Sequence, residues 1–218
     1  MLPRAIFAFD FSMNKPAMAS LVNGKLSFHI FPISLDQISM EKLESCGIIV
    51  KNRQIGKVND GHMTENELII EHVKRASELA DMIVSEMIDI LDFAGISINE
   101  ALVANEGRSF GSIGNAALDL SGYKYVLMLK LSEAGFSKFR TYPPMTIKHT
   151  AGCAKKGKTK DSMIEAMASD GTLQHEIIKT LASDSSKLKK KTNYVTCMDD
   201  IADSYWCMIT TLKKEEMI

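Results

Sequence analysis

The stretch AIFAFDF, residues 5–11, decides the fold because it is apolar and aromatic throughout except for Asp10. A short apolar run of this kind is typical of a buried strand, and Asp10 would lie near the end of that strand. Two further strand patterns follow at Met18–Val22 and Lys25–Ile33, and Asn23–Gly24 between them is a tight-turn signal. The sequence therefore predicts three antiparallel neighbouring strands at the start of the fold.

A long helix is predicted next, because Thr64 and Glu67 form a capping-box pattern at its start. Its apolar residues recur every three or four positions and are Ile69, Val73, Ala76, Ala80, Ile83, Met87, Ile90 and Ala94. This spacing predicts one apolar stripe that packs on the sheet, which is a core feature without a functional role. Ala101–Glu106 is the next predicted strand, and it again ends on a carboxylate.

The remaining elements are shorter. Helices are predicted over about Ser112–Leu131, Asp161–Ser169, Thr172–Ala182 and Asp199–Leu212, and a strand over Lys138–Tyr142 that stops at Pro143. Ser34–Met63 has no clean period and is interpreted as a mixed loop with a short strand near Gly47–Lys51.

Composition limits the class of protein. The chain has 218 residues, of which 45% are hydrophobic and 24% charged, as in ordinary globular proteins, and we expect a single domain over residues 1–218. No apolar run is long enough for a membrane span, and no signal peptide is visible. The four cysteines form no CxxC pair and the five histidines lie far apart, so zinc-ligand spacing is missing. A reducing, cytoplasmic setting is expected.

The net charge of −1 hides a strong asymmetry along the chain. Asp60–Glu106 holds eleven acidic residues against two basic ones, whereas Lys148–Lys191 holds ten lysines against five acids. Each run taken alone is most simply a solvated face. One region would nevertheless repel phosphate and the other would attract it.

Acidic residues also gather at element ends: Asp10, Glu106 and the cluster Asp199, Asp200 and Asp203. Buried carboxylates need partners, and a divalent cation is the natural partner of a convergent set. In the last predicted helix, Asp203 shares a face with both Asp199 and Asp200. The alternative is that Asp199 and Asp200 only cap the start of that helix, where acids interact well with the helix dipole.

The literal pattern GxxxxGK[ST] occurs from Gly152 to Thr159. A nucleotide-binding P-loop must leave an apolar strand, but Pro143–Pro144 and the polar Lys148–Thr150 precede this loop. We therefore expect no nucleotide cofactor. The lysines of the loop are better explained as contacts to a nucleic-acid backbone.

Four segments in order resemble RuvC-type Holliday-junction resolvases, members of the ribonuclease H-like superfamily. They are Phe9–Asp10, Glu106 with Phe110 behind it, Pro144–Lys148 with a Gly/Lys loop to Lys160 and Met163, and Asp200–Asp203. The resemblance covers most of the chain from Ala5 to Leu212. It implies an α/β, ribonuclease H-like fold, with a mixed five-stranded sheet flanked by helices.

The resemblance also implies a function. The protein would be a metal-dependent endonuclease that resolves four-way DNA junctions by symmetric phosphodiester hydrolysis during recombination, repair or genome processing. The acidic tetrad, catalytic and metal-binding, would be Asp10, Glu106, Asp200 and Asp203, holding two Mg²⁺ ions for which Mn²⁺ substitutes. DNA would be contacted by Phe110, Lys148, Lys155, Lys156, Lys158 and Lys160. A homodimer is expected, with the helix after Glu106 as its interface.

Several departures from the family pattern appear. Ser12 replaces a usual glycine, Phe110 lies one residue further from the glutamate than the family's base-stacking aromatic, the basic loop is about one residue longer, and material is added at 34–63 and 173–195. These differences indicate a divergent branch, of bacteriophage or viral type. A broader nuclease acting on branched DNA, flaps or structured RNA, and a non-catalytic DNA-binding module, remain alternatives. Cys153 is interpreted as incidental, and Tyr205 and Trp206 as core residues.

Overall fold

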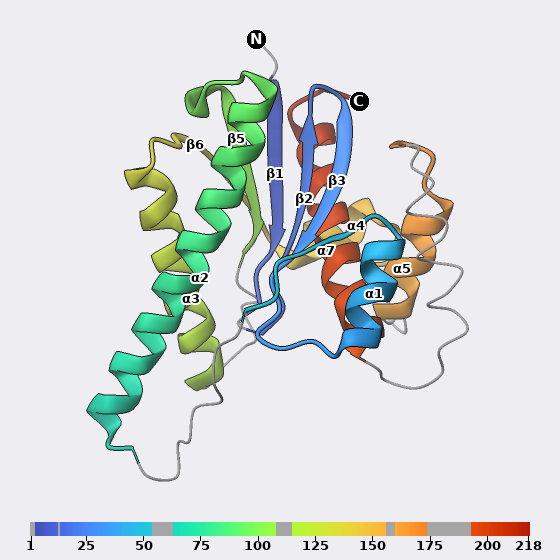
Figure 1. Ribbon diagram of the computed structural model, residues 1–218. Helices are drawn as coiled ribbons and strands as arrows, with labels where there is room; N and C mark the ends of the chain where they lie inside the picture. Colours follow the sequence, from blue (N-terminus) through green and yellow to red (C-terminus); the bar gives the residue numbers. More distant parts are fainter. Residues whose placement is uncertain (1–2, 13, 54–62, 108–114, 156–159, 174–192) are drawn as a thin grey trace.

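The computed structural model describes residues 3–12, 14–53, 63–107, 115–155, 160–173 and 193–218. Within them, one mixed six-stranded sheet has the order β4–β3–β2–β1–β5–β6 (Figure 1). Its strands are β1 (Ala5–Asp10), β2 (Ala17–Val22), β3 (Lys25–Ile30), β4 (Ile49–Val50), β5 (Ala101–Glu106) and β6 (Lys138–Tyr142). The β1, β2 and β3 strands are antiparallel, whereas β5 and β6 run parallel to β1.

The predicted α/β class, with a mixed sheet flanked by helices, is therefore confirmed, but the prediction of five strands is wrong. The sixth strand is the two-residue β4, which pairs in parallel with the end of β3 at the edge of the sheet. The sequence indicated a short strand near this point. Two residues carry too little pattern to show that the strand joins the sheet.

The hairpin between β2 and β3 follows the prediction from Asn23–Gly24. Val22 pairs directly with Lys25, so the loop has two residues. Both loop residues have positive φ, 48° at Asn23 and 78° at Gly24. This backbone matches the primed turn whose twist fits two antiparallel strands.

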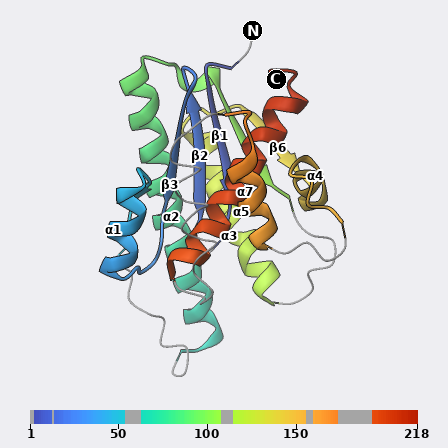
Figure 2. The ribbon, with the colours of Figure 1, turned by 90° about the vertical axis from the view of Figure 1, so that its right-hand side faces the viewer.

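Helices cover both faces of the sheet (Figure 2). One face packs against α1 (Gln37–Ser45), α4 (Pro144–Thr150), α5 (Lys160–Ser169) and α7 (Asn193–Lys214), and the other against α2 (Glu65–Ala94) and α3 (Asn115–Glu133). A short 3-10 turn, Ile98–Glu100, precedes β5. In β1, Ile6 belongs to the first core and Phe7 to the second. Burial on both faces explains why β1 is apolar at nearly every position.

The capping box at the start of α2 is confirmed, because Glu67 N–H donates to Thr64 Oγ1 and the Glu67 carboxylate accepts from the Thr64 N–H. The helix ends at Gly95, whose φ of 63° suits a left-handed cap. The predicted apolar stripe is buried only from Ala76 onward, since Ile69 and Val73 are 54% and 57% exposed. The first turns of α2 extend past the core.

Two predicted segments differ from the structure, and a third is largely untested. The Ser34–Met63 segment contains helix α1, which begins at the Asp36 cap with its carboxylate 2.8 Å from the Ser39 N–H. The last helix begins at Asn193 instead of Asp199. The predicted Thr172–Ala182 helix lies mostly outside the described residues. No helix of the described part of the chain combines the length and apolar character needed to cross a membrane.

A buried polar network fastens α2 to the sheet. His29 is 1% exposed, and its Nδ1 lies 3.2 Å from Glu86 Oε1, while Lys51 Nζ lies 2.6 Å from Glu86 Oε2. On the other side of the imidazole ring, Nε2 lies 3.2 Å from the Ser27 hydroxyl. The close contact with His29, together with Lys51, lowers the pKa of Glu86 to about 2 although burial opposes this shift. Glu86 is therefore a stabilising carboxylate only while it is ionised.

We expect Glu86→Gln to lower the free energy of unfolding by about 2 to 3 kcal/mol near neutral pH. Because the folded pKa lies below the ordinary value, the wild-type advantage is full above about pH 4.5 and is lost as pH falls toward about 2. Urea unfolding at several pH values measures this difference. Glu44→Gln, on the exposed face of α1, is the matched control and should change little. A Glu86→Gln deficit that stays constant down to about pH 2 would contradict the assignment.

Candidate functional site

Two of the predicted acidic residues end neighbouring strands. Asp10 is the last residue of β1 and Glu106 the last residue of β5. These strands are parallel and adjacent, and their register pairs Phe9 with Asn105. Each carboxylate follows that pair by one residue, so both lie at the same end of the sheet, where β1 and β5 finish. Both residues are half-buried.

Helix α7 packs on one face of the sheet, and its residue Cys207 lies near the ends of β1 and β5. The Cys207 thiol is fully buried and lies against the backbone of Phe9. Burial raises its pKa most, and the negative charges of Glu106 and Asp10 raise it further. The charges of both carboxylates therefore act on the Cys207 thiol.

The other two predicted acids lie on α7 before Cys207. At about 100° of helix rotation per residue, Asp200 points within about 20° and Asp203 within about 40° of the direction of Cys207. Asp199 is turned away by about 80° on the same basis. On this basis, Asp200 and Asp203 lie on the same side of α7 as Cys207.

The alternative in which Asp199 and Asp200 only cap a helix is wrong. Helix α7 begins at Asn193, so both residues lie in its second turn, beyond the free backbone N–H groups of the helix start. Cys197 and Met198, just before them, are fully buried in the core. The acids therefore lie beyond the start of the helix.

The structure also places a cation that the sequence did not single out. Lys124 lies on α3, and its Nζ donates a hydrogen bond to the backbone carbonyl of Glu106. Its positive charge opposes the effect of Glu106 and Asp10 on Cys207. Nothing in the local pattern of α3 distinguishes this lysine, because its role depends on how α3 packs along β5.

The predicted DNA-binding residues are only partly described. Lys148 is exposed on α4 and Lys155 is exposed just after it, while Lys160 is the first residue of α5. Phe110, Lys156 and Lys158 lie outside the described residues. The loop at Gly152 follows helix α4 and not a strand, which agrees with the rejection of a nucleotide-binding loop.

Two aromatic residues fix α5 against α7. Tyr205 and Trp206 are 0% and 4% exposed, which confirms them as core residues. Trp206 Nε1 donates to the Met163 carbonyl at 3.0 Å, and the Tyr205 hydroxyl donates to Asp170 Oδ2 at 2.5 Å. Helix α5, which begins at Lys160, is thereby held in a fixed position relative to α7.

Cys153 is a structural residue. It is buried, and its thiol donates to backbone carbonyls of Ala151 and Ser162 at 3.4 and 3.3 Å. This agrees with its interpretation as incidental to any chemistry.

The donor set fits a hard divalent cation in kind. Carboxylate oxygens are the ligands that Mg²⁺ and Mn²⁺ take in proteins, and Asp10 and Glu106 leave neighbouring strands at one edge. In the described part of the chain, however, no three His, Cys, Asp or Glu side chains lie together in a ready metal-binding group. Asp10 and Glu106, at the ends of β1 and β5, are called the acidic edge below. It is an open arrangement and not a closed cage.

Comparison with known proteins gives a likeness of fold. No protein-family model and no curated protein sequence matches the chain. A structure of Thermus thermophilus RuvC is 12% identical with a TM-score of 0.47, and covers 98% of this chain and 96% of that chain. T. thermophilus RuvC in complex with a Holliday junction substrate is 12% identical with a TM-score of 0.48, and covers 98% of this chain and 95% of that chain. At this identity the similarity concerns the fold alone.

Proposed function

We propose that the protein is a metal-dependent endonuclease of the RuvC type that resolves four-way DNA junctions. The observation that carries the proposal is that Asp10 and Glu106 end adjacent parallel strands at the same end of the sheet. Asp200 and Asp203 of α7 are proposed to complete this acidic set. These are the four acids that the sequence resemblance selected from three separate segments. In the proposal the whole chain serves as one nuclease domain.

Hydrolysis of a phosphodiester needs an activated water molecule and a neutralised leaving oxygen. Two divalent cations, Mg²⁺ or Mn²⁺, supply both when they are bound. Asp10, at the end of the central strand β1, would be one of the residues that hold them. Glu106, Asp200 and Asp203 are proposed to complete the set.

The basic segments are proposed to hold the DNA backbone. Exposed Lys148 and Lys155 lie on the face of the sheet that α7 covers, whereas the acidic helix α2 covers the opposite face. DNA phosphates would therefore approach the acidic edge from the α4 and α5 side, with Lys156, Lys158 and Lys160 adding to the contact. Phe110 is proposed to stack on a base at the branch point.

Symmetric cutting of two strands calls for a twofold dimer. Helix α3 is the proposed interface, because Tyr125 and Leu129 lie one turn apart on it and are 64% and 57% exposed. Large apolar side chains at this spacing form one exposed stripe that a second copy would cover.

Cleavage of a labelled immobile four-way junction, beside a linear duplex and a flap, tests the proposal. We expect paired symmetric nicks in the junction alone when Mg²⁺ is present and none in EDTA. Metal-dependent cutting of every branched substrate would instead show a broader structure-specific nuclease. Tight binding without cutting in any metal would contradict the nuclease and leave a DNA-binding module.

A further inference from the structure

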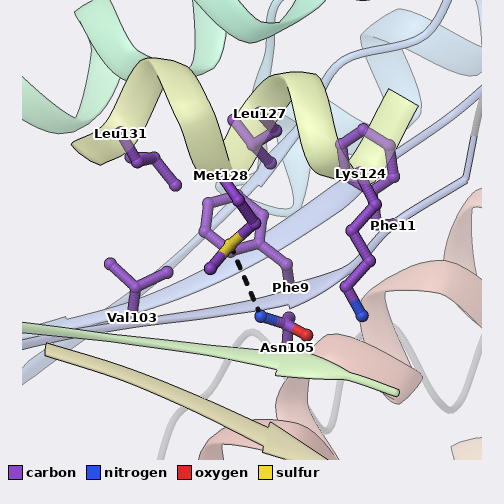
Figure 3. A pocket seen from close by; sticks show the side chains of 8 residues that line it. All are labelled: Phe9, Phe11, Val103, Asn105, Lys124, Leu127, Met128 and Leu131. Carbon is purple, nitrogen blue, oxygen red and sulfur yellow. Dashed lines mark hydrogen bonds between the residues drawn. The ribbon is translucent and has the colours of Figure 1, made fainter. Parts of the chain in front are cut away.

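Lys124 reaches the acidic edge through an apolar cavity between α3 and the sheet. The cavity is lined by Phe9, Phe11, Val103, Asn105, Lys124, Leu127, Met128 and Leu131 (Figure 3). Figure 3 shows the Lys124 side chain extending from α3 toward the strands, with its nitrogen pointing away from the helix. Its Nζ donates to the Glu106 carbonyl at the end of β5. Phe9 and Asn105 in this lining directly precede the two strand-end carboxylates.

The surroundings of the Lys124 ammonium are costly for a positive charge. Phe9 and Asn105 are 1% and 4% exposed, and Leu127 and Leu131 are buried beside them. A charge half removed from water needs compensation from opposite charge and hydrogen bonds. The Glu106 carbonyl supplies one hydrogen bond, and the nearby carboxylates supply negative charge.

The buried Cys207 thiol responds to the same three charges. Glu106 and Asp10 raise the pKa of its thiol, and Lys124 lowers it. All three charges therefore act on one buried sulfur atom of α7. In such surroundings the effective dielectric is well below that of water, so charges a few ångströms apart interact strongly.

The end of β5 is also fixed from its other side. The Thr141 hydroxyl donates to Asn105 Oδ1 at 3.1 Å, and Asn105 Nδ2 lies 3.8 Å from Met128 Sδ on α3. Gly107, just after Glu106, has no room for a side chain without a shift, because a Cβ there would lie 3.2 Å from the Tyr142 carbonyl oxygen. The Lys124 contact thus acts on a strand end that is already held in place.

We propose that Lys124 is a positioning residue that serves as the internal counter-cation of Asp10 and Glu106. It holds the Glu106 backbone and offsets the repulsion between the two carboxylates when no metal is bound. Because it competes with a divalent ion for the same negative charge, it also weakens metal binding in the absence of DNA. This last part rests on the proposed metal-dependent function.

The first test is titration of the protein with Mn²⁺ alone, followed by the electron paramagnetic resonance signal of free Mn²⁺. Lys124→Met keeps the stem and removes the charge, and we expect it to bind Mn²⁺ about five- to tenfold more tightly than wild type. Lys124→Arg keeps the charge and should stay near wild type. Lys130→Met is the matched control on α3, since Lys130 pairs with Asp81 at the surface at 2.9 Å and not with the acidic edge.

The second test needs no metal. In EDTA, Lys124→Met should lower the unfolding midpoint, and it should lower it less in an Asp10→Asn background, because one of the repelling carboxylates is already neutral. If Lys124→Met binds Mn²⁺ within about twofold of wild type, or if its effect in EDTA is additive with Asp10→Asn, the counter-cation role is overturned.

The two proposals fail in different ways. Suppose that the wild-type protein does not bind Mn²⁺, or that Asp10→Asn does not weaken this binding. The metal-dependent function then fails, and with it the effect of Lys124 on metal affinity. The coupling between Lys124 and Asp10 in EDTA would still support the counter-cation role. If Asp10→Asn weakens Mn²⁺ binding but Lys124→Met leaves it unchanged, only the role of Lys124 fails.

Discussion

Asp10→Asn abolishes junction cleavage and leaves junction binding within about threefold of wild type in the outcome we expect. The substitution keeps the size of the side chain and removes its negative charge, so the strand end stays intact while the metal loses a ligand. We expect a loss of at least about 1000-fold in the cleavage rate, which corresponds to about 4 kcal/mol of transition-state stabilisation. Single-turnover cleavage of a labelled junction and a binding assay on the same preparation measure the two effects.

The acids of α7 supply both a replicate and a control. Asp203→Asn and Asp200→Asn should lose as much of the cleavage rate as Asp10→Asn, because both residues lie on the same side of α7 as Cys207. Asp199→Asn should cleave at close to the wild-type rate, since Asp199 is turned by about 80° from the direction of Cys207. Wild-type cleavage in both Asp10→Asn and Asp203→Asn would reject the acidic tetrad. A defect in Asp199→Asn without one in Asp200→Asn would exchange their roles.

The sheet was predictable because its patterns are local. The AIFAFDF run is buried on both faces and therefore lacks alternation, and Asn23–Gly24 takes the two positive φ angles of a tight hairpin. The start of α2 was predictable for the same reason, since the capping box of Thr64 and Glu67 lies within four consecutive residues. Each of these signals can be evaluated without knowledge of the rest of the chain.

The boundaries that were wrong depend on tertiary contacts. Helix α7 begins at Asn193, six residues before the predicted start, and Cys197 and Met198 in this added part pack into the core. Helix α1 is short and mostly polar, with Leu43 as its fully buried apolar residue. Its apolar period was too weak to detect, although its Asp36 cap is a local feature.

The candidate site divides in a similar way. The acids could be selected because each stands at the end of a recognisable element or in the Asp200–Asp203 pair. Lys124 could not, because it is eighteen residues beyond Glu106 in the sequence and reaches it only through the packing of α3 against the sheet. The resemblance pointed to lysines between Lys148 and Lys160, whereas Lys124, which contacts the Glu106 carbonyl, comes from α3.

Junction binding weakens steeply with salt if the basic segments hold the DNA backbone. Each lysine that neutralises a phosphate releases counterions, so the logarithm of the affinity falls with the logarithm of salt concentration by about 0.9 per contact. Raising the salt concentration from about 50 to about 200 mM would weaken binding about 500-fold if five lysines contact phosphates. These are Lys148, Lys155, Lys156, Lys158 and Lys160. A fluorescence anisotropy titration in EDTA measures binding alone, because no cleavage competes.

A single substitution separates these contacts from general electrostatic attraction. Lys148→Gln should reduce the slope of the salt plot by about one unit, since one phosphate contact is lost. Lys25→Gln is the matched control, because Lys25 is exposed at the hairpin end of the sheet, opposite the edge that carries Asp10. It should leave the slope unchanged. Equal reductions in both variants would mean that the overall charge of the protein attracts the DNA, and a flat salt response in the wild type would mean that the α4 and α5 side does not hold the backbone.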